Sequence, residues 1–577
     1  MVPHKPRVAV SREAQGQGYD ENSNGHPRGC GSALTAGHCR RFLLCSPAVS
    51  QSDNTVTRSA RTVSIAVLGS RVLGLVREQV LASLFGASEA FDAFITAFRI
   101  PNLLRDLFAE GALSAAFVSG FTHKLTTDGD KAAWRLANLV LNALLIVLSL
   151  ITLLGILAAP VLVNAIAPGF VNVPGKTELT VLLTRIMFPF LLLVALAALA
   201  MGMLNAKRVF GIPASASMMF NIGSILGGVG FAYWLDPRFG PRAMVGMAIG
   251  TLIGGAAQFL IQVPSLRRIG YRYQPVLDRR DPDFRRIVTM LGPSVVGAAA
   301  VQINIFINNW FASVENGAVS WLNCSFRLMQ FPIGVFGVAI ATATLPSVSA
   351  FAARGDLERF RETLARSLRL AVFLSVPSAC GLAVLAEPII GVIYQHGRFD
   401  AVATAHTAQC LRMFAIGLAG YAALKVLAPS FYAFGDSRTP ARVALFSIGI
   451  NAGLCWLLAW KLRLGAMGLA LSTALVALTN FAQLLWQMRK RLKRIEAKSL
   501  LLSGAKVGLA SALMSAAAWG THHFLDINRY FNLVAAIGVA IVTFGAVCWL
   551  LRVAELGELL AVLRFSKTIT ANKGQVV

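Results

Sequence analysis

Residues 70–121 read SRVLGLVREQVLASLFGASEAFDAFITAFRIPNLLRDLFAEGALSAAFVSGF, a mostly apolar stretch that nevertheless carries many charged side chains. A charge near the centre of a bilayer costs from about 3 to more than 10 kcal/mol, depending on how the cost is measured. We therefore expect these side chains to line a water-filled cavity and to bind a ligand. The stretch is predicted to form two membrane-spanning helices joined by a turn near Gly86–Glu89.

Helical periodicity gathers the charged residues on one side of each predicted helix. At about 100° per residue, the first helix has one polar stripe and the second has another within roughly a quarter turn. The stripes contain Ser70, Arg71, Gly74, Arg77 and Glu78, and then Asp92, Arg99, Asn102, Asp106 and Glu110. Arg105 lies off the second stripe, beside Asn102. Pro101 removes a helix hydrogen bond, and a shift of register there would bring Arg105 round toward the stripe. Several arginines with few acidic neighbours indicate an anionic ligand, because guanidinium groups match phosphate and carboxylate geometry.

The composition is that of a polytopic membrane protein. The chain has 577 residues, of which 56% are hydrophobic and only 14% charged, and its mean hydropathy is +0.63. A soluble protein carries roughly a quarter charged residues. The net charge of +26 would suggest nucleic acid in a soluble protein. Here it is expected to set membrane topology, and no nucleic-acid partner is predicted. The cysteines show no metal-ligand spacing, so no metal site is predicted.

The sequence predicts an all-α fold with about fourteen transmembrane helices. Each apolar segment has about 20 residues or more, enough to cross a hydrocarbon core of about 30 Å. The segments are 62–84, 90–121, 133–162, 178–204, 213–234, 242–264, 286–312, 318–350, 366–395, 404–430, 440–460, 465–487, 500–520 and 531–552.

Basic residues concentrate in alternate connections between these segments. The sixth connection holds seven arginines between 264 and 286, and the twelfth reads RKRLKRIEAK from Arg489. The positive-inside rule then places the even-numbered connections and both termini in the cytoplasm.

An internal repeat relates the two halves of the chain. A shift of 228 residues superposes residues 98–119 on residues 326–347, so Arg99 corresponds to Arg327. An even number of helices per repeat gives two halves of equal orientation, with a substrate site expected between them. We predict a six-helix N-lobe at 59–265, a six-helix C-lobe at 266–490, and two further helices with a tail at 491–577. In segment 318–350, Gln330 shares a face with Arg327. Lys425 and Arg185 are interpreted as helix-end residues.

Residues 1–58 differ in composition from the rest and contain no apolar run long enough to span a membrane. We expect a disordered tail. Alternatively, part of it is not translated, which would require a non-Met start such as Val56, since no methionine occurs between Met1 and Met187.

No nucleotide-binding or hydrolytic motif is present, so no cofactor is predicted. Energy is expected from the membrane potential, an ion gradient of unknown ion, or substrate flow.

Five stretches carry a family resemblance: SRVLGLVRE, DAFITAFRIPNLLRDLFAEGALSAAFV, RLMQFPIGVFGVAIATATLPS, GRFD and KVLAPSFYAFGDSRTP. Together they resemble the MurJ (MviN) family of bacterial lipid II flippases over about residues 60–555. The resemblance implies a fourteen-helix transporter of the multidrug/oligosaccharidyl-lipid/polysaccharide exporter superfamily in the bacterial inner membrane. It would move undecaprenyl-pyrophosphate-linked peptidoglycan precursor to the outer leaflet by alternating access.

The resemblance also implies roles for individual residues. The essential cavity arginines of the family match Arg71, Arg77, Arg105 and Arg327, and Arg99 occupies a basic position of the same motif. Asp92 and Glu110 match the family's acidic positions, with Asn102, Gln330 and Ser70 as neighbouring polar residues. Expected partners are lipid II, membrane lipids and the cell-wall synthesis machinery.

Other functions stay open at this point. A flippase for another polyprenyl-linked glycan and a drug exporter share the fold class. A polytopic lipid II-processing glycosyltransferase is less favoured, since the connections predicted to face outward are short and poor in acidic residues.

Overall fold

The computed structural model describes residues 51–559, except 107–111, 279, 494–496 and 526, and within helices it leaves out the side chains of 51–62, 112–115, 290–298, 300 and 497–501. Residues Arg58–Val577 form one compact unit, distinct from Met1–Thr57. The described residues form helices joined by turns and irregular connections, as predicted, and no strand occurs among them.

The helices follow one another with short connections. They are α1 (Gln51–Phe85), α2 (Glu89–Arg105), α3 (Ala112–Thr127), α4 (Gly129–Ile166), η2 (Pro168–Asn172), α5 (Lys176–Met187), α6 (Phe190–Ala206), α7 (Gly211–Leu235), α8 (Ala243–Leu260), α9 (Val263–Arg268), α10 (Pro282–Ala312), α11 (Ala318–Pro332), η3 (Ile333–Gly337), α12 (Val338–Arg354), α13 (Leu357–Val384), α14 (Ala386–Ile393), α15 (Ala401–Ile416), α16 (Leu418–Ala433), α17 (Arg438–Cys455), η4 (Trp456–Lys461), α18 (Gly465–Leu492), α19 (Ala497–Phe524) and α20 (Arg529–Leu550).

Each of the fourteen predicted segments coincides with one helix or with a helix that is interrupted once or twice. Segment 178–204 breaks between α5 and α6 at Pro189, and segment 318–350 contains the π-helical turn η3 after Pro332. Proline removes a backbone donor, so such breaks are expected where it occurs inside a helix. By length and composition, nine of the described helices or helix runs can cross a membrane, or ten with the bent pair α15–α16. The count of fourteen crossings therefore stays a prediction.

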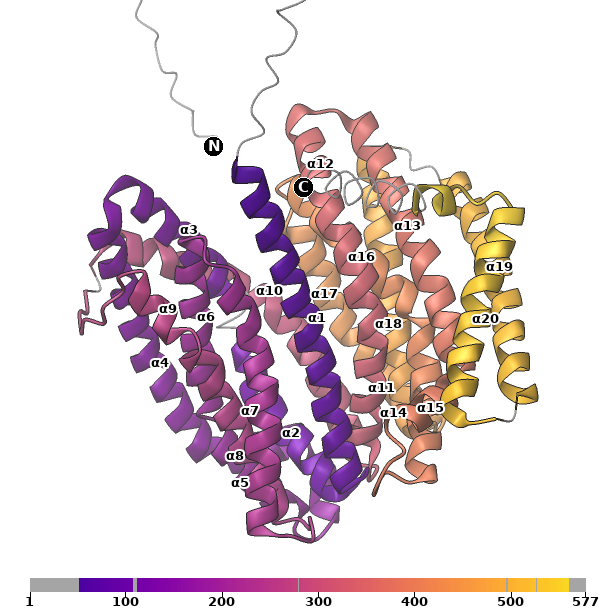
Figure 1. Cartoon of the computed structure of the whole chain (residues 1–577), viewed down its shortest axis with the longest axis horizontal. Coiled ribbons are helices and arrows are strands. Elements are labelled where there is room, and N and C mark those ends of the chain that lie inside the picture. Colours follow the sequence, from indigo (N-terminus) through magenta and orange to yellow (C-terminus); the bar gives the residue numbers. More distant parts are fainter. Residues whose placement is uncertain (1–50, 107–111, 279, 494–496, 526, 560–577) are drawn as a thin grey trace, which may run out of the picture. The chain divides into compact units, whose positions relative to one another are not determined.

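The helices pack in two groups. Helices α3 to α8 contact one another, and so do α11 to α18, while α19 and α20 pack on each other and on α13 and α14. Figure 1 shows the first group in violet and magenta and the second in salmon and orange. Helix α10 contacts α3 and α4 as well as α17 and α18, so it connects the groups. The lobe boundaries at 265 and 490 remain predictions.

Helix α1 contacts both groups. On one side Gly69 and Gly74 lie against Met218 and Asn221 of α7, and the Asn221 amide donates to the Ser70 carbonyl over 3.2 Å. On the other side Arg71 lies against Gly334 of η3. In Figure 1 α1 runs between the two groups.

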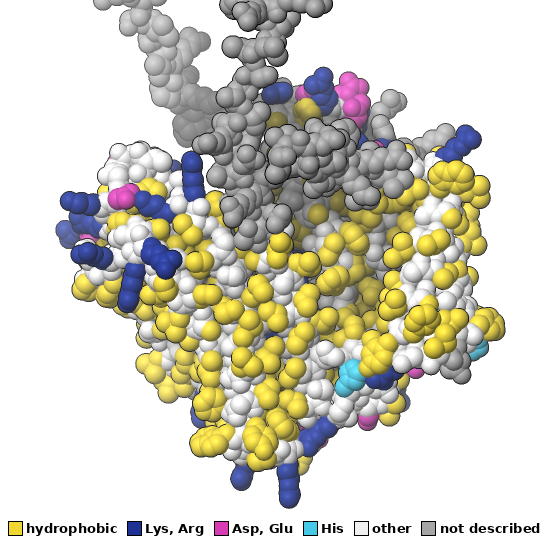
Figure 2. All heavy atoms as spheres, viewed as in Figure 1, with side chains coloured by type: hydrophobic (Ala, Val, Ile, Leu, Met, Phe, Trp, Pro, Cys, Tyr) yellow, Lys and Arg dark blue, Asp and Glu magenta, His cyan; other side chains and the backbone are white. Residues whose placement is uncertain are grey.

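The outer surface of the helices is apolar. Figure 2 shows hydrophobic side chains over the middle of the visible face, with lysine and arginine gathered toward the two ends of the helices. On α4, for example, Leu150, Leu157 and Val161 are all more than half exposed. Such a surface suits contact with lipid tails.

Candidate functional site

A cavity of about 1320 Å³ lies between the two groups of helices. Its lining comes from α1, α2, α7 and α8 on one side and from α11, α16, α17 and α18 on the other, with α10 between them. It extends from Val319, near the start of α11, to Ser437 in the α16–α17 connection and Arg438 at the start of α17. This connection lies at the opposite end of the bundle from the α1–α2 turn, because α11 to α16 cross it three times between these points.

The lining is strongly basic. Among the described residues it includes six basic and two acidic side chains. These are Arg77, Arg99, Arg105, Arg327, Lys425 and Arg438, together with Glu78 and Asp106. An excess of fixed positive charge in a partly desolvated cavity attracts anions more strongly than the same charges would in water.

Glu78 joins two of these arginines across the cavity. Its carboxylate lies 2.6 Å from the Arg327 guanidinium and 3.5 Å from that of Arg77, and it accepts a hydrogen bond from Asn323 over 3.1 Å. Arg77 also lies over the Phe220 ring, 5.1 Å from its centre. One carboxylate therefore partly neutralises two arginines, one from α1 and one from α11.

The α2 residues form a second group. Arg105 pairs with Asp106 over 2.8 Å, and Gln302 of α10 donates to the other oxygen of Asp106 over 3.1 Å. Arg99, which corresponds to Arg327 in the repeat, lines the same cavity, and no ion pair involves it among the described residues. The two repeat mates therefore meet in one space, as the sequence offset predicted.

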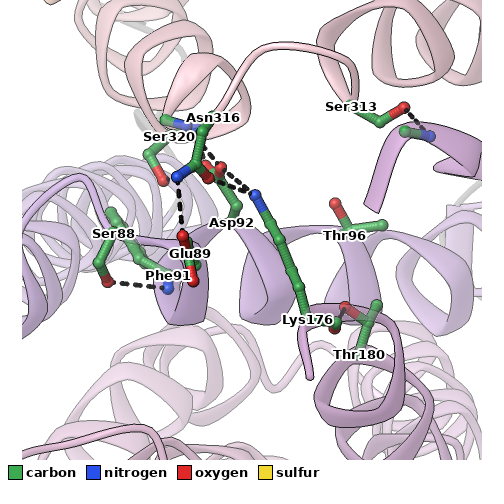
Figure 3. A network of polar contacts seen from close by, with 12 residues as sticks. Ser88, Glu89, Phe91, Asp92, Thr96, Lys176, Thr180, Ser313, Asn316 and Ser320 are labelled. Carbon is green, nitrogen blue, oxygen red and sulfur yellow. Dashed lines mark hydrogen bonds and ion pairs between the residues drawn. The ribbon is translucent and has the colours of Figure 1, made fainter. Parts of the chain in front are cut away.

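Asp92 closes off the end of the cavity near the α1–α2 turn by joining α2 to the start of α11. Figure 3 shows its contacts. One carboxylate oxygen accepts from the Ser320 amide over 2.9 Å and from its hydroxyl over 2.6 Å. The other accepts from the Gly317 amide over 2.8 Å and from Lys176 over 2.9 Å. Asp92 thereby holds the start of α11 against α2, and its charge is met by four donors. The set Glu89, Asp92, Lys176, Asn316, Gly317 and Ser320 is called the Asp92 cluster below.

Lys176 and Asn316 complete this cluster. The Lys176 ammonium also donates to the Asn316 amide oxygen over 2.8 Å and lies 4.2 Å from the centre of the Phe170 ring. Asn316 in turn donates to Glu89 over 3.0 Å. Both charged side chains of the Asp92–Lys176 pair are buried. A buried pair of this kind is tolerated only when its remaining hydrogen-bonding positions are filled, as they are here.

A second contact closes the same end. The backbone amide of Arg398 donates to the Ser83 carbonyl over 2.9 Å, and its guanidinium donates to the carbonyls of Arg238 and Phe239, each over 2.6 Å. Gly86 is required at this point, because a Cβ there would lie 2.6 Å from the Arg398 carbonyl oxygen and the backbone has a φ of +65°.

The structure separates the predicted site residues into three sets. Arg77, Arg99, Asn102, Arg105, Arg327 and Gln330 line the cavity. Asp92, Ser70 and Arg71 lie outside its lining: Asp92 at the sealed end, and the other two where α1 meets α7 and η3. Glu110 falls outside the described residues.

Three basic residues were missed or misplaced by the sequence interpretation. Lys425 is interpreted from the sequence as a helix-end residue, but it lies in the middle of α16 and lines the cavity. Arg438, which the sequence interpretation did not select, also lines the cavity. Lys176 was counted as a connection residue, whereas it is buried against Asp92. The signal available for Lys425 was a lysine inside an apolar segment, where a charge is costly.

The family model of the lipid II flippase MurJ matches residues 81–538. A probable lipid II flippase MurJ of Vibrio cholerae is 32% identical over 516 residues, 86% of this chain and 96% of the relative. The lipid II flippase MurJ of Burkholderia cenocepacia is 36% identical over 439 residues, covering 75% and 84%. This chain belongs to the MurJ family.

Solved structures agree with this assignment. A lipid II flippase MurJ in an inward closed conformation superposes with a TM-score of 0.71 at 25% identity, over 85% of this chain and 98% of that one. A multidrug resistance MATE family transporter of the MOP superfamily, in an inward-facing conformation, reaches 0.60 at 17% identity, over 75% and 95%. The second match shows the fold alone. MurJ family membership makes the chain a multi-pass membrane protein.

Proposed function

We propose that this protein translocates lipid II from the inner to the outer leaflet of the bacterial cytoplasmic membrane by alternating access. The observation that carries the proposal is the basic cavity between two groups of helices, sealed at one end by the Asp92 cluster. Family membership at 31–36% identity to named lipid II flippases supports the same substrate.

The cavity chemistry fits the substrate. Lipid II carries a pyrophosphate and a large polar headgroup, which hydrocarbon does not admit. Guanidinium groups can replace the water around the pyrophosphate with bidentate hydrogen bonds. Glu78 and Asp106 hold the arginines in place while the cavity is empty, and the bound anion would compete with them for the same donors.

The orientation follows from charge. The even-numbered connections carry most of the basic residues, which favours their cytoplasmic placement and that of both termini. The α16–α17 connection, where the cavity lining ends, then faces the cytoplasm, and the Asp92 cluster faces outward. We propose that this conformation receives lipid II from the inner leaflet.

We propose transport without a chemical step on the substrate, driven by the membrane potential or an ion gradient. Moving one elementary charge across 100 mV is worth about 2.3 kcal/mol, so a charged cavity that changes its access can be driven by the potential.

The test is rescue of bacteria depleted of their own lipid II flippase. The unaltered chain should restore growth, whereas Arg77→Ala, Arg105→Ala and Arg327→Ala should fail at normal expression. Lysine at these positions should rescue only in part, because an ammonium lacks the bidentate fork.

Arg359→Ala is the matched control, since Arg359 is 67% exposed and, among the residues that the structure describes, pairs with its neighbour Asp356 alone, over 3.6 Å. It should grow like the unaltered chain. Full rescue by two or more of the cavity variants would contradict pyrophosphate binding by these arginines.

A further inference from the structure

Arg71 of α1 lies in a notch that Gly334 creates in η3. A Cβ on Gly334 would occupy the space of the Arg71 guanidinium, whose Nη1, Cζ and Nη2 are the nearest atoms to that position. The notch lies within a π-helical turn that follows Pro332. Widened turns of this type are uncommon and occur often at functional sites.

The notch belongs to a longer pairing between α1 and the α11–η3 run. Ala87 meets Gly317, Glu78 meets Arg327, and Arg71 meets Gly334. Arg71 and Glu78 are seven residues apart, and so are Arg327 and Gly334. Two antiparallel helices in one constant register produce this pattern, because each step forward on one is matched by a step back on the other. The position of Arg71 is therefore set by the same packing that sets Glu78 against Arg327.

Arg71 differs from the cavity arginines in its partners. Arg77 and Arg327 share Glu78, and Arg105 pairs with Asp106, whereas Arg71 has no ion pair or hydrogen bond among the described residues. Its side chain is exposed, and it lies about two helical turns from the level of Glu78, or about 10 Å along α1. No described residue occupies the donors of this guanidinium, so they are available to a ligand.

We infer that Gly334 is a positioning residue for substrate binding: its missing side chain seats the Arg71 guanidinium so that it can bind an anionic group of the substrate. The inference rests on the function proposed above. The group is a phosphate or a carboxylate, either of which matches a guanidinium fork. An arginine side chain that samples several rotamers loses conformational entropy when it binds a ligand. One that is already held in a single rotamer loses less.

Gly337 is a matched control three residues further along η3. A Cβ at Gly337 would meet Ala422 at 3.5 Å and Lys425 at 3.7 Å, which is ordinary van der Waals contact. Alanine forms helices more readily than glycine, so neither substitution weakens the helix through propensity. Gly334→Ala and Gly337→Ala therefore differ mainly in whether they displace Arg71.

The experiment measures the affinity of the purified full-length protein for lipid II and for undecaprenyl pyrophosphate, together with thermal unfolding. Gly334→Ala should weaken binding about tenfold, the effect of losing one hydrogen bond to a charged group. Gly337→Ala should bind like the unaltered protein. In an Arg71→Ala background, Gly334→Ala should cause no further loss, since the two changes remove one interaction.

If Gly334→Ala fails to fold, Arg71→Ala/Gly334→Ala should fold, because the collision is gone; failure of this double variant as well would overturn the inference.

Weaker binding of both ligands assigns Arg71 to the pyrophosphate, and weaker binding of lipid II alone assigns it to the peptide carboxylates. Two results would overturn the proposal that Gly334 positions Arg71. One is an equal loss of affinity in Gly334→Ala and Gly337→Ala, and the other is additive losses of affinity for substitutions at positions 71 and 334. The proposed function fails separately, if the unaltered chain does not rescue growth.

Discussion

A single carboxylate, that of Asp92, holds residues that are far apart in the sequence. It is fully buried, and its oxygens accept from Lys176, from Gly317 and twice from Ser320. Charge burial of this kind is stable only with all four donors in place. We therefore expect the cluster to open as a unit.

Replacing Lys176 with methionine should weaken the closed end. The change leaves the Asp92 charge buried without its cation, which costs about 3–5 kcal/mol. Thermal unfolding of the purified protein should show a large loss of stability. Lys207→Met is the matched control, because Lys207 pairs over 2.7 Å with a largely exposed Asp130 and should lose no more than about 1 kcal/mol. Similar small losses for both variants would show that Asp92 does not depend on its cation.

At the scale of elements, a proline inside a helix leaves a backbone carbonyl without a hydrogen-bond donor, and a side chain of a neighbouring helix can supply that donor. Pro160 of α4 has no backbone N–H, so it leaves the carbonyl of Ile156 without its usual helix donor. The Arg185 side chain of α5 donates to this carbonyl over 3.3 Å. An arginine on an apolar helix is thus explained by a proline on a neighbouring helix. Arg185 lies in the last turn of α5, in agreement with its interpretation as a helix-end residue.

This explanation predicts a compensating pair of substitutions. Arg185→Met should destabilise the protein by about 1 kcal/mol, the net contribution of one hydrogen bond, since this bond is exposed. Pro160→Ala restores an N–H at position 160, so Arg185→Met should cost much less in that background. Thermal unfolding of the single and double variants checks this, and strictly additive losses would contradict it.

Asp436 links two elements at the end opposite the Asp92 cluster. Its carboxylate accepts from the Thr439 amide over 3.0 Å, at the start of α17, and from Arg491 of α18 over 3.0 Å. Burial acts to raise the pKa of Asp436, but the hydrogen bonds from Thr439 and the charge of Arg491 outweigh it and hold the pKa below its usual range.

Asp436→Asn should therefore show a pH-dependent loss of stability. A carboxyl whose pKa is lowered on folding stabilises above its unfolded pKa of about 3.9, and the contribution disappears as the pH falls through the folded pKa. The difference in melting temperature between the two proteins should be largest near neutral pH and should shrink below about pH 4. A difference that is constant with pH would exclude the ionised carboxylate as its source.

At the scale of the whole molecule, alternating access requires the Asp92 cluster to open. Glu89 and Asn316 are exposed members of it, joined over 3.0 Å, so they can be replaced without removing the buried Asp92 charge. The two groups of helices would separate here when the cavity opens outward.

Cysteines at positions 89 and 316, in a variant without the native cysteines, should crosslink readily in the resting protein. The crosslink should block translocation, and reductant should restore it. Cysteine at either position alone serves as the control. A crosslinked protein that translocates lipid II at the normal rate would rule out opening at this end.

The sequence by itself determined the helices, the repeat and the family. Apolar length and period are local properties, so the predicted segments coincide with described helices to within a few residues at most ends. Six of the ten candidate residues line the cavity, and all of them except Arg105 lie on faces predicted from helical periodicity. Asp92 and Ser320, which are separated by the same 228 residues as the repeat mates, form a hydrogen bond in the structure.

Only the tertiary structure decided which polar residues meet. Lys176 binds Asp92, which is 84 positions away in the sequence. Lys425, on α16, lines the same cavity as the arginines of α1 and α2. Arg71 shares the stripe of Arg77, yet the constant register of α1 against α11 and η3 places it in the Gly334 notch. Periodicity fixes the direction of a side chain around its own helix. The partner that it meets depends on how deep and in which register two helices pack, and that is set by contacts between distant parts of the chain.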